Sequence, residues 1–413
     1  MAEVLGELRE KLGLLEGKTL EKQAAKTLAE EVGRRVDAFP PNDSMSKPQK
    51  AEFLYIKGKA LSLQDSYDRR AEDALGRSVK LNPTQPEAWN VLGEVFYMKK
   101  DYVQSKRCFE TSLQLCGPNK ISLRKLSMVS RFIGNPEERA SNVLESVKLA
   151  KEAVRLDLAD GESWCKPHAD VLGNAHLTNF FVNEPSPTEL NSALRSYTQA
   201  QGHLALPNPD LHFNRATAFK FLESYTEALE DFKKAQELDP ELNAGAEIEW
   251  IEGFLVLVAS KLSTQCGLKP KKITSLIRQL PLVLTGHPFA HSYTFRKLPE
   301  LRDFANAGVI LCAKITARLA KEGETPARFV ALDASGVFFV LSFYSASPNA
   351  YAELVNFATV FVRDPFLLKV RAIVADKTLE FLCVRVGDPS MVLVDNKGLE
   401  GSAGQSVLVN QPL

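Results

Sequence analysis

The sequence predicts a multidomain chain in which an all-α array of helical hairpins, wound as a superhelix, precedes a small all-β barrel. Two observations carry this prediction. Before about residue 263, small residues, large apolar residues and prolines return at the spacing of paired amphipathic helices. After residue 280, short segments rich in Val, Ile, Phe and Leu alternate with Gly, Pro, Asn and Asp, which is typical of strands joined by turns.

The composition is that of a globular protein. Of the 413 residues, 45% are hydrophobic, and 51 Lys and Arg balance 51 Asp and Glu. This balance argues against a nucleic-acid footprint over the whole chain. We find neither a signal peptide nor an apolar run near the roughly 20 residues that span a bilayer, so we expect no membrane partner. The six cysteines show no CxxC spacing, which predicts buried thiols in a reducing compartment.

The clearest hairpin covers residues 209–240, PDLHFNRATAFKFLESYTEALEDFKKAQELDP. Ala216 and Ala228 fall where two antiparallel helices would cross closely, and Phe232 would fill the space beside the crossing. Pro240 cannot continue the second helix. This is the spacing of the 34-residue tetratricopeptide repeat. One such hairpin cannot bury its own apolar face, so we expect neighbouring repeats.

Four earlier hairpins are predicted, at 51–83, 86–119, 122–158 and from Trp164 onward. In the first, Gly58 lies at the helix crossing. The fourth carries an apparent insertion, CKPHA, at 165–169. A closing helix is expected at 244–262. We therefore expect a helical capping segment at 1–45, about five repeats with the closing helix at 46–263, and a basic linker with a short helix at 264–285.

The remainder predicts an OB-fold domain at 286–400 and a flexible tail at 401–413. Five strands are expected, at 308–319, 327–333, 336–344, 366–374 and 379–387, with a short helix at 348–357 between the third and fourth strands.

We find no catalytic motif in the sequence. GxGxxG, Walker, HExxH and GxSxG patterns are all missing, so we expect no enzyme activity and no cofactor. Cys165, His168 and His176 are close in sequence, but a metal site normally needs more ligands at fixed spacing. We therefore favour ordinary repeat residues at these three positions.

First helices of stacked repeats line a groove in which polar side chains can hold a peptide. The candidates are Asn90, Arg131, Asn174, Asp210, Asn214 and Glu249. An Asn can bond an extended backbone, an Arg can grip a carboxylate, and an Asp or Glu can hold an amine. For each residue taken alone, a hydrogen bond within the repeats is the competing interpretation.

Two further features have competing interpretations. The basic cluster Lys269, Lys271 and Lys272 is either a solvated loop or a phosphate contact. The aromatic residues of the third predicted strand either stack on bases or fill the core: Phe338, Phe339, Phe343 and Tyr344.

Several stretches resemble the tetratricopeptide repeat protein 5 (Strap) family of stress-responsive cofactors. They are EAWNVLGEVFYMKKDY (87–102), NKISLRKLSMVSRF (119–132), DGESW (160–164), LGNAHL (172–177), NPDLHFNRATAFKFLESYTEALEDFKKA (208–235) and GLKPKKITSLI (267–277). The resemblance covers nearly the whole chain from about residue 50. The CKPHA insertion and the N-terminus depart from the family pattern.

The resemblance implies an adaptor, cytoplasmic and nuclear, that reads the N-terminal peptide of nascent tubulin at the ribosome. It would trigger tubulin mRNA decay through a recruited deadenylase complex. Arg131 would bind the peptide's acidic side chain, and Asp210 with Glu249 would hold its N-terminal end. Lys269 and Lys271 would meet ribosomal RNA phosphate. The alternative is a nuclear scaffold of an acetyltransferase coactivator complex in the stress response.

Overall fold

The computed structural model describes residues 45–63, 66–159, 168–183, 186–203, 208–281, 292–319, 326–344, 354–374 and 377–399, with isolated positions between 27 and 35. The chain divides into two compact units. Unit 1 comprises Met1–Asn183 and Arg195–Pro207, and unit 2 comprises Glu184–Leu194 and Asn208–Leu413. Most of the predicted capping segment, the tail at 401–413, Trp164 and Cys165 lie outside the described residues.

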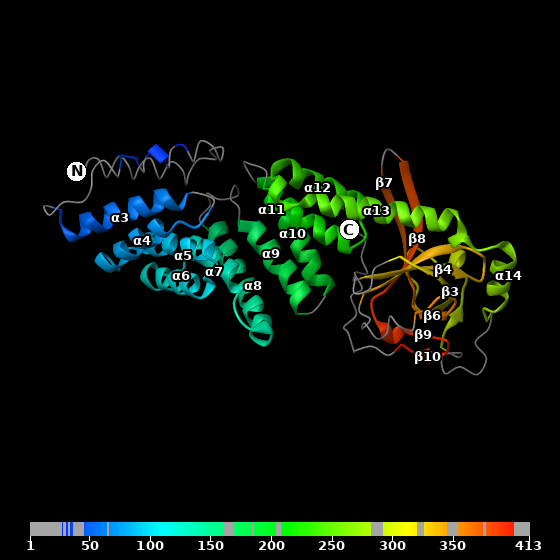
Figure 1. The fold of residues 1–413 in the computed structure, drawn as a ribbon. Coiled ribbons are helices and arrows are strands. Elements are labelled where there is room, and N and C mark those ends of the chain that lie inside the picture. Colours follow the sequence, from blue (N-terminus) through cyan, green and yellow to red (C-terminus); the bar gives the residue numbers. More distant parts are fainter. Residues whose placement is uncertain are drawn as a thin grey trace. The chain divides into compact units, whose positions relative to one another are not determined.

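The described part of unit 1 is built of antiparallel helix pairs (Figure 1). Its helices are α3 (Lys47–Ser62), α4 (Arg69–Leu81), α5 (Pro86–Met98), α6 (Tyr102–Cys116), α7 (Lys120–Ser130), α8 (Pro136–Ala159), α9 (His168–Val182) and the second half of α10 (Pro187–His203). These helices occupy the predicted hairpins. The predicted insertion at 165–169 is described only at its last two residues, which begin α9.

Close helix crossings explain why glycine stands at two positions of the first helices. A Cβ atom on Gly58 would lie 2.4 Å from Leu75 Cγ, and one on Gly93 would lie 2.8 Å from the Phe109 ring. Each glycine therefore lets the second helix of its own hairpin approach the first more closely than any side chain would permit. The predicted crossing at Gly58 is confirmed.

Unit 2 contains the last repeat, the closing helix and the short basic helix. These are α11 (Pro209–Phe221), α12 (Tyr225–Leu238), α13 (Ala244–Ser263) and α14 (Pro270–Arg278). α12 ends before Pro240 as predicted. The short helix expected within 264–285 includes part of the basic cluster. Because proline is preorganised for the first helical position, Pro270 opens α14, and Lys271 and Lys272 belong to its first turn rather than to a loop.

The β domain of unit 2 is a ten-stranded sheet with the order β10-β9-β6-β3-β4-β5-β8-β7-β2, and β1 pairs with β3. β5 and β8 are parallel, as are β1 and β3. The strands are β1 (Thr294–Phe295), β2 (Phe304–Ala305), β3 (Val309–Arg318), β4 (Ala327–Asp333), β5 (Phe338–Phe343), β6 (Thr359–Arg363), β7 (Phe366–Val374), β8 (Lys377–Val386), β9 (Val392–Val394) and β10 (Lys397–Gly398).

The five predicted strands correspond to β3, β4, β5, β7 and β8. The prediction missed β6, which pairs with β3 and β9, and the short strands β1, β2, β9 and β10. Of the helix expected at 348–357, residues 354–357 are described and form no helix. The predicted class, tetratricopeptide-repeat helices followed by an OB-fold domain, is confirmed.

The last repeat and the sheet share one hydrophobic core within unit 2. Tyr225 and Phe232 of α12 and Leu255 of α13 belong to the same buried cluster as Val340 of β5 and Phe381 of β8. This outer face of the sheet is therefore covered by helices of the same chain.

The aromatic residues around β5 lie in the interior. Phe339 and Phe343 are fully buried, Tyr344 is 7% exposed, and Phe338 packs against the shared core. The interpretation as core residues is confirmed for Phe339, Phe343 and Tyr344, whose covered rings cannot stack on bases. Phe338 is half-buried.

Candidate peptide-binding and phosphate-binding sites

Arg131, the C-terminal cap of α7, is a buried cation in unit 1. Only 8% of its surface is exposed, and its Nη1 donates a hydrogen bond to the carbonyl of Val171 at 3.3 Å. Asp170 lies in the same region, but its carboxylate accepts a hydrogen bond from the Val171 amide at 2.6 Å. Among the described side chains, none forms an ion pair with Arg131.

Burial makes this cation costly to hold. It lowers the pKa of Arg131, and the neighbouring Tyr197, Tyr97 and Asp170 side chains offset that effect only in part. A guanidinium group stays protonated in proteins, so the cost appears as an incompletely compensated positive charge. An anion that reached Arg131 would relieve it.

Asn174 lies beside the same site. The Tyr197 hydroxyl donates a hydrogen bond to Asn174 Oδ1 at 2.7 Å, and the Tyr197 ring packs so closely on α9 that a Cβ on Gly173 would lie 2.6 Å from it. Tyr197 therefore connects Asn174 with Arg131. The structure brings these two predicted residues to one place in unit 1, although Asn174 already accepts one hydrogen bond within the repeats.

Asp210, in the first turn of α11 in unit 2, is a second electrostatically uncompensated group. Its side chain is at the surface, yet partial burial and repulsion by the Asp239 carboxylate raise its pKa. A carboxyl group with a raised pKa gains from a neighbouring cation. An amine or a basic side chain is the chemistry that would stabilise it.

The two other predicted groove residues of unit 2 are less distinctive. Glu249 is exposed on α13, and Asn214 is half-buried on α11. On the same helix, His212 Nδ1 lies 2.8 Å from Asp231 Oδ1. Arg215 donates to both oxygens of Asp231, at 2.6 and 2.7 Å. The sequence did not predict this group of three side chains, whose buried members His212 and Asp231 are bonded within the repeat.

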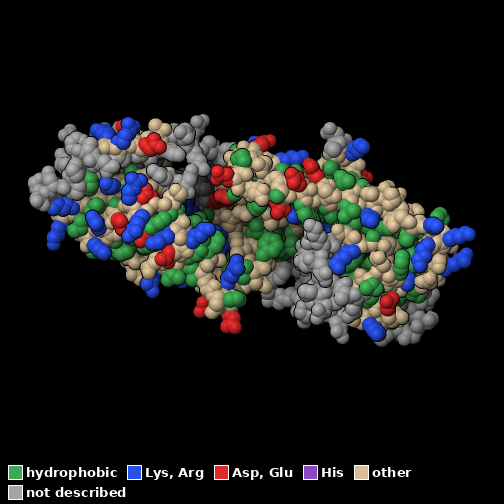
Figure 2. All heavy atoms as spheres, viewed as in Figure 1, with side chains coloured by type: hydrophobic (Ala, Val, Ile, Leu, Met, Phe, Trp, Pro, Cys, Tyr) green, Lys and Arg blue, Asp and Glu red, His purple; other side chains and the backbone are tan. Residues whose placement is uncertain are grey.

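The predicted phosphate-binding lysines surround the start of α14. Lys269 is its N-cap, and Lys269, Lys271 and Lys272 are all exposed. Lys272 Nζ lies 4.4 Å from the centre of the Phe357 ring. At the right-hand edge of Figure 2, where Figure 1 places α14, Lys and Arg side chains project from the surface. The partial positive charge of a helix N-terminus adds to these lysines and favours an anion there.

The predicted cysteines and His176 do not form a metal site within the described ranges. Cys108, Cys312 and Cys383 are buried as expected, whereas Cys116 is exposed. His176 is buried in α9. Within the described ranges, no cluster of three or more His, Cys, Asp and Glu residues could hold a metal ion. No helix in the same ranges has the length and apolar character needed to cross a membrane.

The sequence reading also missed an aromatic cluster next to Arg131. The rings of Tyr102 and Phe132 stack with centroids 5.0 Å apart, and Tyr97 packs edge-on against Phe132 at 6.0 Å. Phe132 is nevertheless 51% exposed. The GEVFYMKKDY and SRFIG stretches contain these rings, but their meeting depends on how α5, α6 and α7 pack.

Comparison with known families gives two matches. The model described as "Tetratricopeptide repeat protein 5 OB fold domain" matches residues 292–407, and the model described as "Tetratricopeptide repeat" matches residues 209–242. Together they cover the β domain and the last helical hairpin. Both are consistent with the architecture described above, and neither is a catalytic family.

Curated relatives match most of the chain. Human tetratricopeptide repeat protein 5 is 35% identical over 87% of this chain and 83% of its own length. The mouse protein of the same name is 34% identical over the same shares. Among solved structures, a structure of Pseudomonas aeruginosa pilF is 12% identical, with a TM-score of 0.40, and the match covers 60% of this chain and 97% of that one. That structural likeness is too weak to carry an argument.

Proposed function

This chain belongs to the tetratricopeptide repeat protein 5 family, and from that membership we propose that it reads the N-terminal peptide of nascent tubulin at the ribosome and triggers tubulin mRNA decay. The family and its repeats support the coarser statement that the protein is a protein-binding adaptor. The deadenylase complex recruited for decay would be a further partner.

The observation that carries the proposal is that Arg131 is a buried cation without an ion-pair partner among the described residues. This guanidinium is 8% exposed, donates one long hydrogen bond and has no ion pair among the described residues. A buried charge without a partner lowers the free energy of unfolding by several kcal/mol, so Arg131 does not stabilise the fold through its charge. A ligand carboxylate supplies the missing partner, which fits the acidic side chain of the proposed peptide.

The family resemblance assigns the N-terminal end of the peptide to Asp210. Partial burial and repulsion by Asp239 raise the pKa of this carboxyl group, which therefore gains from a cation. A free peptide N-terminus or a basic side chain is such a cation, and Glu249 would add a second carboxylate. Asn174 and Asn214 would bond the backbone. Asp210 therefore suits a positively charged group of a ligand, and Arg131 suits a negatively charged one.

The lysines at α14 support contact with the ribosome. Lys269 and Lys271 are exposed, and no ion pair occupies them in the described structure. Exposed cations at a helix N-terminus bind phosphate without reading base sequence. Lys272 lies over Phe357 and would contribute less freely.

The deciding experiment is a pull-down of translating ribosomes with wild type and Arg131→Ala while soluble tubulin is raised. We expect tubulin-synthesising ribosomes to be enriched by wild type and lost in the variant. Because Arg131 is buried, its replacement could also disturb the fold. The control therefore changes the peptide and leaves the protein intact. A synthetic tubulin N-terminal peptide whose glutamate is replaced by glutamine should bind intact wild type at least about thirtyfold more weakly.

Two results would contradict the proposal. Equal binding of the glutamate and glutamine peptides would remove Arg131 from peptide recognition. Failure of wild type to associate with any translating ribosome would leave the nuclear scaffold of an acetyltransferase coactivator complex as the function to test.

A further inference from the structure

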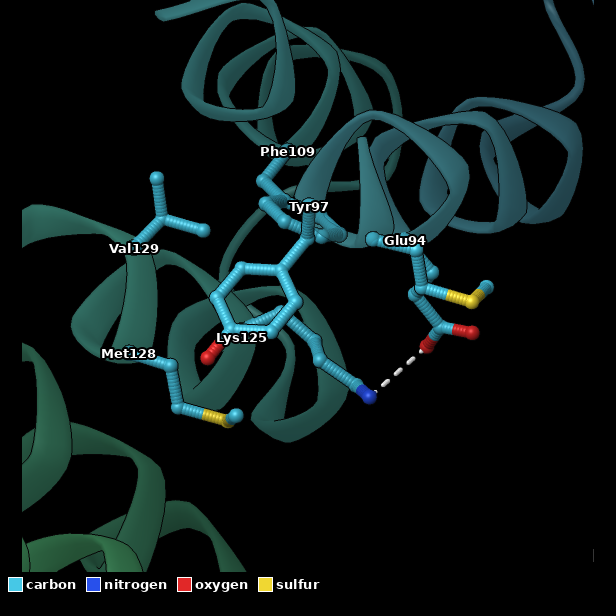
Figure 3. Close-up of a pocket in the computed structure, with 7 residues that line it drawn as sticks. Glu94, Tyr97, Phe109, Lys125, Met128 and Val129 are labelled. Carbon is cyan, nitrogen blue, oxygen red and sulfur yellow. Dashed lines mark ion pairs between the residues drawn. The ribbon is translucent and has the colours of Figure 1, made fainter. Parts of the chain in front are cut away.

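A small apolar cavity opens between α5 and α7 within unit 1. Seven residues line it: Glu94, Tyr97 and Met98 of α5, Phe109 of α6, and Lys125, Met128 and Val129 of α7. Five of the seven have apolar or aromatic side chains. Six of the seven come from the first helices of consecutive hairpins, the surface on which repeat proteins bind peptides. Figure 3 shows the Tyr97 ring and the Met128 side chain facing this space.

The charged residues stay at the edge of the cavity. Lys125 Nζ and Glu94 Oε1 form an ion pair at 2.9 Å, with 24% and 36% of their side chains exposed, which the dashed line in Figure 3 marks. Because this pair satisfies both charges at the rim, the interior is left to Phe109, Val129 and the two methionines. The cavity therefore offers an apolar interior with a polar edge.

Its size limits what can enter. The volume is about 170 Å³, close to the roughly 150 Å³ of an engineered apolar cavity that binds benzene. A cavity of this volume accepts one side chain of the size of Leu or Met. Met98 and Met128 are flexible and polarisable, so they can close around side chains of slightly different shape.

The cavity adjoins the buried cation. Met128 and Val129 lie in the last turn of α7, directly before Arg131. Tyr97 belongs to the cavity wall and also lies within electrostatic range of the Arg131 guanidinium. An apolar cavity and an uncompensated positive charge are therefore parts of one surface, and a ligand that fits it combines an apolar and an acidic group.

We propose that this cavity binds a Leu-sized or Met-sized side chain of the same extended peptide whose acidic side chain reaches Arg131. The inference rests on the proposed function for its occupant. In an extended peptide, side chains two residues apart share a face at a spacing of roughly 6.5 Å. The apolar residue therefore stands two positions before or after the acidic one.

The test measures binding of full-length protein to fluorescein-labelled synthetic hexapeptides with a free N-terminus and glutamate at the third position. Leucine at the first or the fifth position is compared with alanine at the same position. We expect the better of the two leucine peptides to bind about tenfold more tightly than its alanine counterpart, because a buried leucine side chain gains most of its transfer free energy.

A protein variant locates the effect. Met128→Trp places a larger side chain at the cavity wall and should reduce the ratio of leucine-peptide to alanine-peptide affinity to about one. Leu144→Trp, at a 49% exposed position of α8 outside the cavity, is the matched control and should keep the preference. Equal loss for leucine and alanine peptides in Met128→Trp would mean a structural defect and overturn the assignment of the cavity.

The outcomes separate this inference from the proposed function. Peptides that need glutamate but bind alike with leucine or alanine overturn the cavity inference and leave Arg131 recognition standing. A leucine preference that survives replacement of glutamate by glutamine supports the cavity and contradicts the role of Arg131. If wild type binds none of the peptides, both are overturned.

Discussion

Arg385 Nε donates a hydrogen bond to Glu223 Oε2 at 2.9 Å, although the two residues are 162 positions apart in the chain. Glu223 lies in the tight turn between α11 and α12 with a left-handed φ of 58°. Its other oxygen accepts hydrogen bonds from Arg328 Nε at 3.2 Å and from Ser342 Oγ at 2.7 Å. One buried carboxylate of the last repeat thus holds three strands of the β domain.

Replacing Glu223 should destabilise unit 2. Glu223→Gln leaves Arg328 and Arg385 buried without a counter-charge, and removing one partner of a buried ion pair typically costs about 3–5 kcal/mol. Urea unfolding followed by Trp250, in a background with the other two tryptophans replaced by phenylalanine, measures the free energy of unfolding. Trp250 lies on α13 against Phe254, so it reports on this unit.

An exposed ion pair of the same unit provides the control. Lys369 and Asp303 lie 3.0 Å apart with 68% and 47% of their side chains exposed. Asp303→Asn should change the free energy of unfolding by less than about 1 kcal/mol. Comparable losses in Glu223→Gln and Asp303→Asn would show that Glu223 does not hold the repeat to the sheet.

The same carboxylate predicts an acid sensitivity. Burial alone would raise the pKa of Glu223, but Arg385, Arg328 and the Ser342 hydroxyl outweigh it and lower the pKa from 4.5 to about 2. Between these two values the unfolded chain binds the proton and the folded chain does not. The stabilisation is therefore complete above about pH 4.5 and is lost as the pH falls toward 2.

Other carboxylates also titrate in this pH range. The effect of Glu223 is therefore measured as the difference in unfolding free energy between wild type and Glu223→Gln. We expect the gap in unfolding free energy between wild type and Glu223→Gln to be constant near pH 7 and to shrink below pH 4.5. Urea unfolding at intervals from pH 7 to pH 3 measures it. A gap that stays constant down to pH 3 would mean that Glu223 titrates at the same pH in both states.

The helical hairpins could be predicted because their signals are local. Ala216, Ala228 and Pro240 fall within one repeat, and Gly58 is close in sequence to the Leu75 that it accommodates. Alternation and turn residues likewise predicted β3, β4, β5, β7 and β8. The short strand β6 carries too few residues to show a period, and its identity depends on pairing with β3.

The charge environments could not be predicted, because they depend on distant residues. Glu223 has partners 105 and 162 positions away, and no local pattern marks it. Arg131 could be selected as a candidate from the family-like LSMVSR stretch. Its burial, its weak hydrogen bonding and the adjoining cavity follow only from the packing of α7 against α5 and α9.

Alanine substitutions at two glycines of the first hairpin distinguish the effect of packing on stability from that of helix propensity. Gly58→Ala places a Cβ 2.4 Å from Leu75 Cγ and should lower the free energy of unfolding of unit 1 by about 1–3 kcal/mol. A Cβ on Gly76 of α4 would meet no neighbouring atom within 4 Å, so Gly76→Ala should raise the free energy of unfolding by about 0.5–1 kcal/mol. Urea unfolding followed by Trp89 distinguishes the two. Stabilisation by both substitutions would show that α3 and α4 are farther apart than described.

Charge reversal at α14 tests whether its lysines touch ribosomal RNA. Lys269→Glu combined with Lys271→Glu should weaken ribosome association roughly tenfold or more at physiological salt, since each lost phosphate contact also removes the counterion release that drives binding. The double variant Lys80→Glu with Lys151→Glu changes the net charge equally, at exposed positions of α4 and α8. Co-sedimentation with ribosomes over a salt series measures both.

Because fewer phosphates are contacted, the α14 variant should show a shallower dependence on salt, whereas the control should match wild type. Equal weakening in both would mean that net charge alone governs the association, and no weakening in either would leave the α14 lysines as solvated side chains.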